Sequence, residues 1–311
     1  MKGYDNQKQN TLLGERTPAV SAGFAYTLTA VAILAFSFLF LLVLAAAGVM
    51  GEDITSQNWY LYCSYLLTPL AFACVIGCIL RWSKTPILAE IKAQKCKGKY
   101  FLLALLLQIG LLSLSELNTL FIEFLEIFGY QSAEIALPSL NGMGIVGVLL
   151  VVAVLPAVFE EWIFRGLLLR GMKTSFGTVG TVLIGGALFA LYHQNPAQTA
   201  YQFCCGAAFT LVALRAGSFL PTVLSHFVNN ALIIVLYKFG VTQFSMPIYA
   251  IILCVSGVCL IFALLWLLVW DKGKTENVSK TEEASAERKR FWKSASVGIG
   301  IFALLWLSWI I

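Results

Sequence analysis

A succession of apolar runs, each close to the length of a membrane-spanning helix, constrains this chain more than any other feature. A helix that crosses the hydrocarbon core of a bilayer needs about 20 consecutive apolar residues. Runs that approach or exceed this length lie near residues 22–50, 59–80, 100–118, 143–171, 178–193, 198–215, 218–238, 247–270 and 295–311. We therefore expect an all-α fold, a polytopic transmembrane helix bundle of about eight or nine spans.

Composition supports the same class. Of the 311 residues, 59% are hydrophobic and 12% are charged, whereas soluble domains carry about 25% charged residues. The formal net charge is +5, but the basic residues lie in short loops between apolar runs, which suits membrane orientation better than nucleic-acid binding. We expect the lipid bilayer, and no nucleic acid, as a partner.

The charged loops predict an orientation. The loop 81–99 contains six basic residues and one acidic residue, and the loops on either side of it are acidic. Because basic loops face the cytoplasm, this pattern predicts a cytoplasmic N-terminus. The 29-residue apolar run 22–50 is longer than the apolar region of a signal peptide, about 7–15 residues. We therefore expect an uncleaved first span, with cleavage after Ala45-Ala46-Ala47 as the alternative.

The apolar runs divide the chain into four parts. We predict a polar N-terminal tail at 1–21, transmembrane helices with an interfacial segment over 22–141, a membrane core of four consecutive helices over 142–240, and C-terminal transmembrane helices over 241–311. Residues 119–141 mix apolar and acidic side chains at helical spacing, which predicts an interfacial helix. Residues 271–294 are rich in charged and hydroxyl side chains, which predicts a solvated linker that tethers the last span loosely.

Two adjacent carboxylates, Glu160 and Glu161, lie inside the fourth apolar run. Ionisable groups in a membrane segment are costly and mark functional sites. Arg165 follows Glu161 by four residues, so the two can form an ion pair on one helix face and leave Glu160 free to project into a cavity. The alternative is that both glutamates mark the end of the span. The apolar pattern, however, continues for two turns to Arg170 and Lys173, which are better interface markers.

The chain contains only two histidines, His193 and His226, and both lie in later apolar runs. Phe189 precedes the first by four residues and Asn230 follows the second by four, so each pair shares a helix face. Each histidine alone could be a hydrogen-bond partner between helices, worth about 0.6 kcal/mol on average. With a rise of about 1.5 Å per residue, both histidines and Glu160 fall in one layer near mid-membrane, so we expect them to converge.

Three motifs in this order resemble those of the CPBP intramembrane proteases, which include the type II CAAX prenyl endopeptidases and the Abi-type bacteriocin-immunity proteins. The motifs are Glu160-Glu161-x-x-x-Arg165, Phe189-x-x-x-His193 and His226-x-x-x-Asn230. They cover about a quarter of the chain, and the ordered set is much more specific than the first motif alone.

The resemblance implies an α-helical CPBP/Abi catalytic core over 142–240 and roles for the motif residues. Glu160 would be the general base that activates water, assisted by His193. His226 and Asn230 would donate hydrogen bonds to the oxyanion. The supporting positions would be Glu161, Arg165 and Phe189.

A metal-dependent mechanism is an open alternative. Glu160, His193 and His226 could form a zinc site of two histidines and one carboxylate with a bound water. The HExxH spacing of common zinc proteases does not occur. The resemblance implies the glutamic type, which needs no cofactor.

We expect a hydrolase, an intramembrane endopeptidase whose substrate is a membrane-associated or lipidated peptide, in a bacterial plasma membrane. One alternative is a bacteriocin self-immunity protein, non-enzymatic or protease-based, that binds a peptide toxin. Another is a transporter with a proton-linked carboxylate, for which the sequence shows no inverted repeat.

Overall fold

The computed structural model of this chain describes residues 10–11, 14–15, 17–49, 51, 53–82, 94–131, 136–241, 244–271 and 282–310. Much of the predicted basic loop 81–99 and the first part of the predicted linker 271–294 fall outside these described residues.

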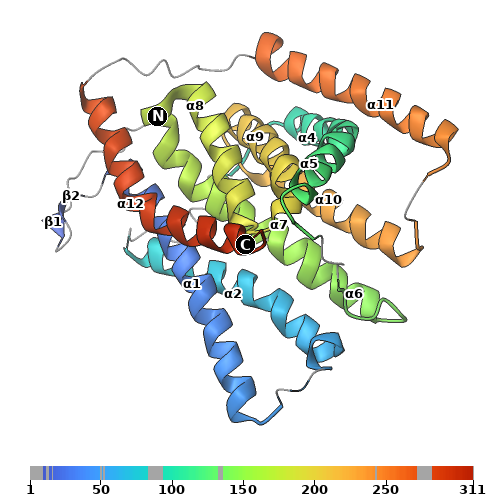
Figure 1. Cartoon of the computed structure of the whole chain (residues 1–311). Coiled ribbons are helices and arrows are strands. Elements are labelled where there is room, and N and C mark those ends of the chain that lie inside the picture. Colours follow the sequence, from blue (N-terminus) through green and yellow to red (C-terminus); the bar gives the residue numbers. More distant parts are fainter. Residues whose placement is uncertain are drawn as a thin grey trace.

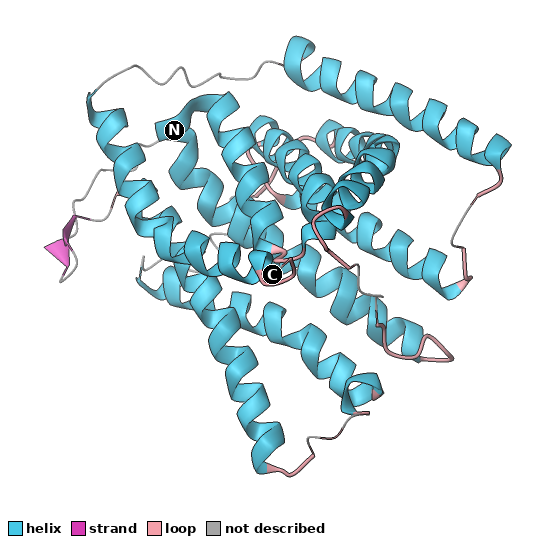
Figure 2. Cartoon of the chain, viewed as in Figure 1, coloured by secondary structure: helices cyan, strands magenta, loops and turns pink. Residues whose placement is uncertain are grey.

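The described residues are almost entirely helical, which confirms the all-α prediction (Figure 2). The exception is a pair of two-residue antiparallel strands, β1 (Asn10–Thr11) and β2 (Gly14–Glu15), before the first helix. The helices are α1 (Pro18–Ala46), η1 (Ile54–Ser56), α2 (Asn58–Trp82), α4 (Lys99–Leu111), η2 (Leu112–Leu114), α5 (Ser115–Glu126), α6 (Gly144–Val148), η3 (Leu149–Val154), α7 (Leu155–Glu161), η4 (Trp162–Leu168), α8 (Leu169–Tyr192), η5 (Pro196–Gln198), α9 (Thr199–Ala216), α10 (Leu220–Lys238), α11 (Met246–Leu265), η6 (Trp266–Trp270) and α12 (Glu282–Leu307).

Six helical stretches of the described chain are long and apolar enough to cross a membrane. They are Pro18–Ala46, Asn58–Trp82, Lys99–Glu126, Gly144–Tyr192, Leu220–Lys238 and Met246–Trp270. Each of the nine predicted spans falls on a helix, and the stretch Gly144–Tyr192 contains two of them. The spans predicted at 198–215 and 295–311 are the helices α9 and α12, which are not among the six.

The stretch Gly144–Tyr192 reverses direction at Gly177. The backbone there has φ 66° and ψ −179°, a region that is essentially restricted to glycine because a Cβ would clash. Beyond this residue the chain returns along itself, so the ring centroids of Phe164 and Phe189 are 5.0 Å apart. The predicted spans 143–171 and 178–193 are therefore two arms joined by a single kinked residue instead of a loop.

The interfacial helix predicted in residues 119–141 begins as a direct continuation of the helix that forms the preceding span, 100–118. Helix α5 continues α4 through the single turn η2, so one helical stretch extends to Glu126. Along α5 the side chains of Leu120 and Phe124 are exposed and that of Leu125 is buried. An apolar face of this kind suits the boundary between lipid and water.

Helix α12 is packed tightly, so the prediction of a loosely tethered last span is wrong. It lies along α1 and α8 (Figure 1), and its Phe291 and Phe302 are fully buried. The Thr27 hydroxyl of α1 donates to the carbonyl of Ser294 at 2.7 Å. The helix begins at Glu282, so the second part of the predicted linker is helical.

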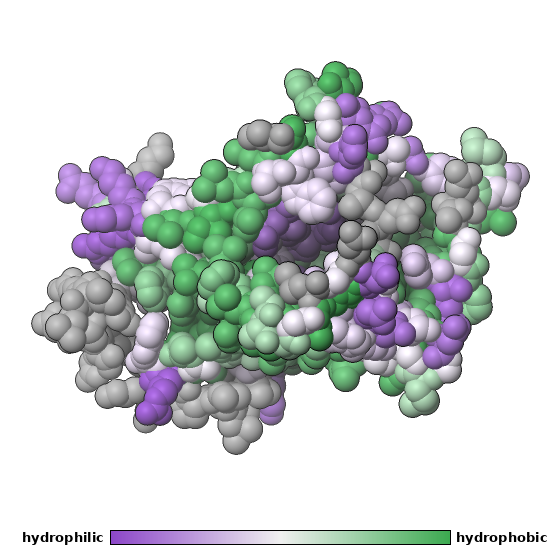
Figure 3. Space-filling model, turned by 60° about the horizontal axis from the view of Figure 1, so that its bottom comes forward, coloured by the Kyte–Doolittle hydropathy of each residue, from purple (hydrophilic) through white to green (hydrophobic). Residues whose placement is uncertain are grey.

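The buried side chains form two large apolar clusters, and η4 and α8, which carry predicted site residues, contribute to the first. The first joins α1, α2, η4, α8 and α12, and the second joins α4, α9 and α11. Helix α11 lies at the edge of the molecule (Figure 1) and exposes large apolar side chains, among them Ile251 and Val258. Figure 3 shows broad hydrophobic areas on one face, with hydrophilic residues at its left and right and in a hollow near its middle. This surface is that of a protein that contacts lipid.

Candidate active site

Helix α7 carries the two glutamates and lies between the π-helices η3 and η4. π-Helical turns are rare and occur frequently at functional sites. Pro156 in the first turn of α7 has no N–H, so it cannot donate to the carbonyl of Val152 four residues earlier. Glu160 and Glu161, at the end of α7, are both buried, with exposed fractions of 6% and 0%.

Glu161 and Arg165 form the ion pair that their spacing predicts. Arg165 Nη1 donates to Glu161 Oε1 at 2.7 Å, and neither side chain is exposed. Arg165 Nη2 also donates to the Gly206 carbonyl at 3.1 Å. The guanidinium lies 4.3 Å from the ring centroid of Phe189. Phe189 therefore supports the arginine through a cation–π contact, which gives this motif position a structural reason.

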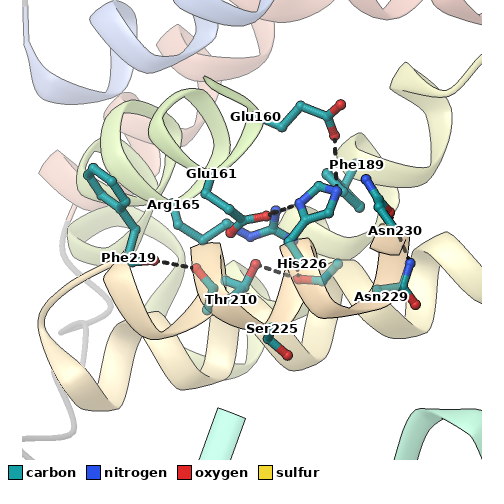
Figure 4. A network of polar contacts seen from close by, with 12 residues as sticks. Glu160, Glu161, Arg165, Phe189, Thr210, Phe219, Ser225, His226, Asn229 and Asn230 are labelled. Carbon is teal, nitrogen blue, oxygen red and sulfur yellow. Dashed lines mark hydrogen bonds and ion pairs between the residues drawn. The ribbon is translucent and has the colours of Figure 1, made fainter. Parts of the chain in front are cut away.

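The imidazole of His226 lies between the two carboxylates (Figure 4). Its Nδ1 is 2.9 Å from Glu161 Oε1, and its Nε2 is 3.8 Å from Glu160 Oε2. An ionised carboxylate only accepts hydrogen bonds, so Nδ1 carries the proton that it donates to Glu161. Nε2 then faces Glu160 as an acceptor when the ring is neutral and as a donor when the ring is protonated. The structure thus brings together the first and third predicted motifs.

Glu160 is less free than its spacing predicts. The Tyr192 hydroxyl donates to Glu160 Oε1 at 3.0 Å, while the buried Oε2 has no hydrogen-bond partner. Glu161 Oε2 also has none, but the other oxygen of Glu161 is held by a guanidinium. The two carboxylates therefore differ in the charge beside them: Glu161 is neutralised by Arg165, and Glu160 contacts one hydroxyl and the far side of His226.

His193 lies beside the site, and it makes a polar contact with the backbone of Phe189. Its Nδ1 is 2.8 Å from the Phe189 carbonyl, and its ring centroid is 4.8 Å from those of Phe189 and Tyr192. Among the hydrogen bonds of the described residues, none joins His193 to Glu160 or His226. Because Nδ1 faces a carbonyl acceptor, Nδ1 carries the proton and Nε2 is the available base.

Asn230 is fixed in a chain of buried amides. Its Nδ2 donates to the Val152 carbonyl at 3.1 Å, and its Oδ1 accepts from Asn229 at 3.1 Å. Asn229 Oδ1 in turn accepts from Gln108 at 2.7 Å and from the Tyr201 hydroxyl at 3.0 Å. An amide nitrogen has two hydrogens, so one N–H of Asn230 remains for another acceptor.

Sequence reasoning missed four polar residues of the site. Tyr192 and Asn229 bond to the predicted Glu160 and Asn230, and Gln108 and Tyr201 bond to Asn229. Tyr192 and Asn229 directly precede His193 and Asn230 in the sequence. This adjacency to motif residues could have identified them. Gln108 had another signal, because it is the only polar side chain between Phe101 and Leu112, in the most apolar part of the third run. Nothing in the sequence distinguishes Tyr201 from other tyrosines near a helix start.

Helices α8 and α9 cross closely enough to place these groups. A Cβ on Gly186 would lie 2.8 Å from the Phe203 carbonyl, and one on Gly206 would lie 2.9 Å from Phe189 Cβ. Small residues permit such close approach of helices in membranes. The crossing brings the Gly206 carbonyl to the Arg165 guanidinium and holds Phe189 against it.

Among the described residues, no preformed set of ligands supports the metal-dependent alternative. Across the part of the chain that the structure describes, no three His, Cys, Asp or Glu side chains are grouped so that they could hold a metal ion. Of the predicted ligands, Glu160 and His226 approach one another and His193 points to Phe189.

Comparison with known proteins gives one result. Residues 142–232 match the Rce1-like family, described as type II CAAX prenyl endopeptidase Rce1-like. No curated protein and no solved structure matches the chain. The matched segment contains all three predicted motifs, whereas Gln108 lies outside it. The chain is therefore an integral membrane protein with a segment, residues 142–232, that is similar to the Rce1-like type II CAAX prenyl endopeptidases.

Proposed function

We propose that this protein is an intramembrane endopeptidase of the glutamic type, which hydrolyses a peptide bond of a membrane-associated or lipidated peptide. The assignment of Glu160 as the general base rests on one observation. Glu161 is held at 2.7 Å by Arg165, whereas Glu160 has a buried oxygen with no partner, 3.8 Å from His226 Nε2. A buried carboxylate that no guanidinium holds is suited to take a proton.

The reaction begins when Glu160 Oε2 takes a proton from water and the water oxygen attacks the peptide carbonyl carbon. A C–O bond forms and the carbonyl electron pair moves to the oxygen. When the tetrahedral intermediate collapses, the C–N bond breaks and Glu160 returns its proton to the leaving amine. His193, through its free Nε2, assists by orienting the attacking water.

The developing oxyanion needs positioned donors. The free N–H of Asn230 and the Nε2–H of a protonated His226 lie on one face of α10, because the two residues are four apart. Glu161 accepts the Nδ1–H of His226 and so stabilises the protonated ring. Arg165 in turn holds the Glu161 carboxylate in place.

The protein is proposed to lie in a bacterial plasma membrane with its N-terminus in the cytoplasm. The support is the charge of the loops: the order of the predicted spans assigns the basic residues near 81–99, 170–173 and 215 to the same side of the membrane.

Cleavage in a defined membrane tests this proposal. The purified full chain is reconstituted in lipid vesicles with a set of membrane-anchored peptides, half of them carrying a prenyl group at a C-terminal cysteine. We expect new peptide termini with wild-type protein and none with Glu160→Gln, as detected by mass spectrometry. A parallel sample with a chelator distinguishes the glutamic from the metal-dependent type. If wild-type protein cleaves nothing and both forms protect cells from a peptide toxin, the protein is a binding protein instead.

A further inference from the structure

The Asn230 amide is oriented by a polar chain that extends away from the two glutamates. The chain runs from Gln108 on α4 and Tyr201 on α9, through Asn229, to Asn230 on α10. Gln108 and Asn229 are buried, with exposed fractions of 3% and 7%. Buried polar groups of this kind are normally satisfied, and here their mutual bonds satisfy them.

The orientation of each side-chain amide from Gln108 to Asn230 follows from the Val152 carbonyl. The Val152 oxygen can only accept, so the Asn230 atom that faces it at 3.1 Å must be the nitrogen. The Asn230 oxygen then faces Asn229, which must present its own nitrogen. The Asn229 oxygen is therefore turned to the two donors, Gln108 Nε2 and the Tyr201 hydroxyl. Rotating any one amide by half a turn would set like groups against each other.

Pro156 supplies the reason that the Val152 carbonyl can accept this bond. In a regular α-helix the carbonyl of residue 152 would accept the N–H of residue 156. Proline has no N–H, and the segment 149–154 before it is a π-helix. The carbonyl is thereby left with capacity for the Asn230 amide, which approaches it from α10.

We propose that Asn229, Gln108 and Tyr201, together with Pro156, are positioning residues that hold the free N–H of Asn230 toward the reacting carbonyl. The inference rests on the proposed function, because Asn230 acts there on the oxyanion. None of these four residues touches Glu160, Glu161 or His226 through a hydrogen bond of the described chain, so they act on the reaction through Asn230.

The test measures kcat and KM of the full chain in vesicles, on a peptide that the wild-type protein cleaves. Tyr201→Phe and Gln108→Leu each remove one donor to Asn229, and the double variant removes both. We expect each single change to lower kcat a few-fold and the double change to lower it at least tenfold, with KM unchanged. Pro156→Ala should lower kcat as well, because its N–H competes for the Val152 carbonyl.

Two controls separate positioning from general loss of stability. Gly298→Ala, at the distant contact of α12 with α1, should lower the melting temperature without lowering kcat. In an Asn230→Ala background, the Tyr201→Phe, Gln108→Leu and Pro156→Ala changes should have no further effect on kcat.

The outcomes are distinct. The inference is overturned if Asn230→Ala lowers kcat while the double variant leaves it unchanged, or if the changes lower kcat equally with and without Asn230. If Asn230→Ala leaves kcat unchanged, the assignment of Asn230 in the proposed mechanism fails. If the wild-type protein cleaves no peptide, the proposed function fails, and this inference fails with it.

Discussion

The Nδ1 atom of His226 lies 2.9 Å from Oε1 of Glu161, which is the oxygen that also accepts from Arg165 at 2.7 Å. One carboxylate oxygen thus joins α7 to α10 and holds a guanidinium and an imidazole at once. Because this oxygen is occupied on both sides, Glu161 serves as the anchor of the site, and the opposite edge of the imidazole is turned to Glu160.

Replacing Glu161 should destabilise the fold much more than replacing Glu160. Glu161→Gln leaves Arg165 buried without a counter-charge, and breaking a buried ion pair from one side costs about 3–5 kcal/mol. Glu160→Gln keeps a group that can accept from Tyr192, so its effect on stability should be small. The comparison is thermal unfolding of both variants in the same detergent. Equal melting temperatures for the two variants would contradict the division of roles.

Removing the Tyr192 hydroxyl should affect activity through Glu160. Tyr192→Phe leaves Glu160 Oε1 without its donor, so the carboxylate can rotate away from the position that it holds at 3.0 Å. We expect kcat to fall by about tenfold, which corresponds to about 1.4 kcal/mol in the barrier. Tyr201→Phe is not a control here because it acts on Asn229. A suitable control is Tyr26→Phe, whose hydroxyl donates to the Leu188 carbonyl away from the glutamates. Similar kcat losses in the two variants would argue against a specific role for Tyr192.

The packing of α12 on α1 predicts a contrast between two glycines of one helix. A Cβ on Gly298 would lie 2.7 Å from Thr27 Cα, whereas a Cβ on Gly300 would meet nothing within 4 Å. Gly298→Ala should therefore destabilise the protein by about 1–3 kcal/mol, as overpacking does. Gly300→Ala should leave stability nearly unchanged. If both substitutions have the same small effect on thermal unfolding, α12 is not packed as described.

Chelation should leave activity intact. The glutamic mechanism uses only protein groups, and His193 is turned to the Phe189 carbonyl instead of joining Glu160 and His226 as a ligand. We expect the cleavage rate to be the same before and after dialysis against a strong chelator. A rate that is lost on dialysis and restored by added zinc would revive the metal-dependent type.

The sequence was sufficient for the parts of the site that depend on local spacing. Glu161 and Arg165 pair as their four-residue separation predicts, because the helical repeat fixes that contact. The apolar runs likewise predicted the helices. The contact of His226 with Glu161 joins two helices distant in the chain. Membrane depth and the ordered motifs predicted that the histidines and Glu160 converge, but not this contact.

Other features depend on side-chain packing that spacing does not encode. The apolar runs predict a break between 171 and 178, but nothing in them shows that the reversal takes place at the single residue Gly177. The polar character of residues 282–294 hid a helix whose apolar face, with Phe291 and Ala295, is buried against α1. The hydroxyl of Tyr192 reaches Glu160 only because the two arms around Gly177 fold together.

The cleavage rate of Glu160→Gln under single-turnover conditions tests the central claim most directly. General-base catalysis contributes about 10²–10⁴-fold in rate, so the variant should cleave a lipid-embedded peptide at least 100-fold more slowly than the wild-type protein. Its melting temperature should stay close to that of the wild type. A folded Glu160→Gln protein that cleaves within about threefold of the wild-type rate, below any general-base contribution, would show that Glu160 does not activate the water.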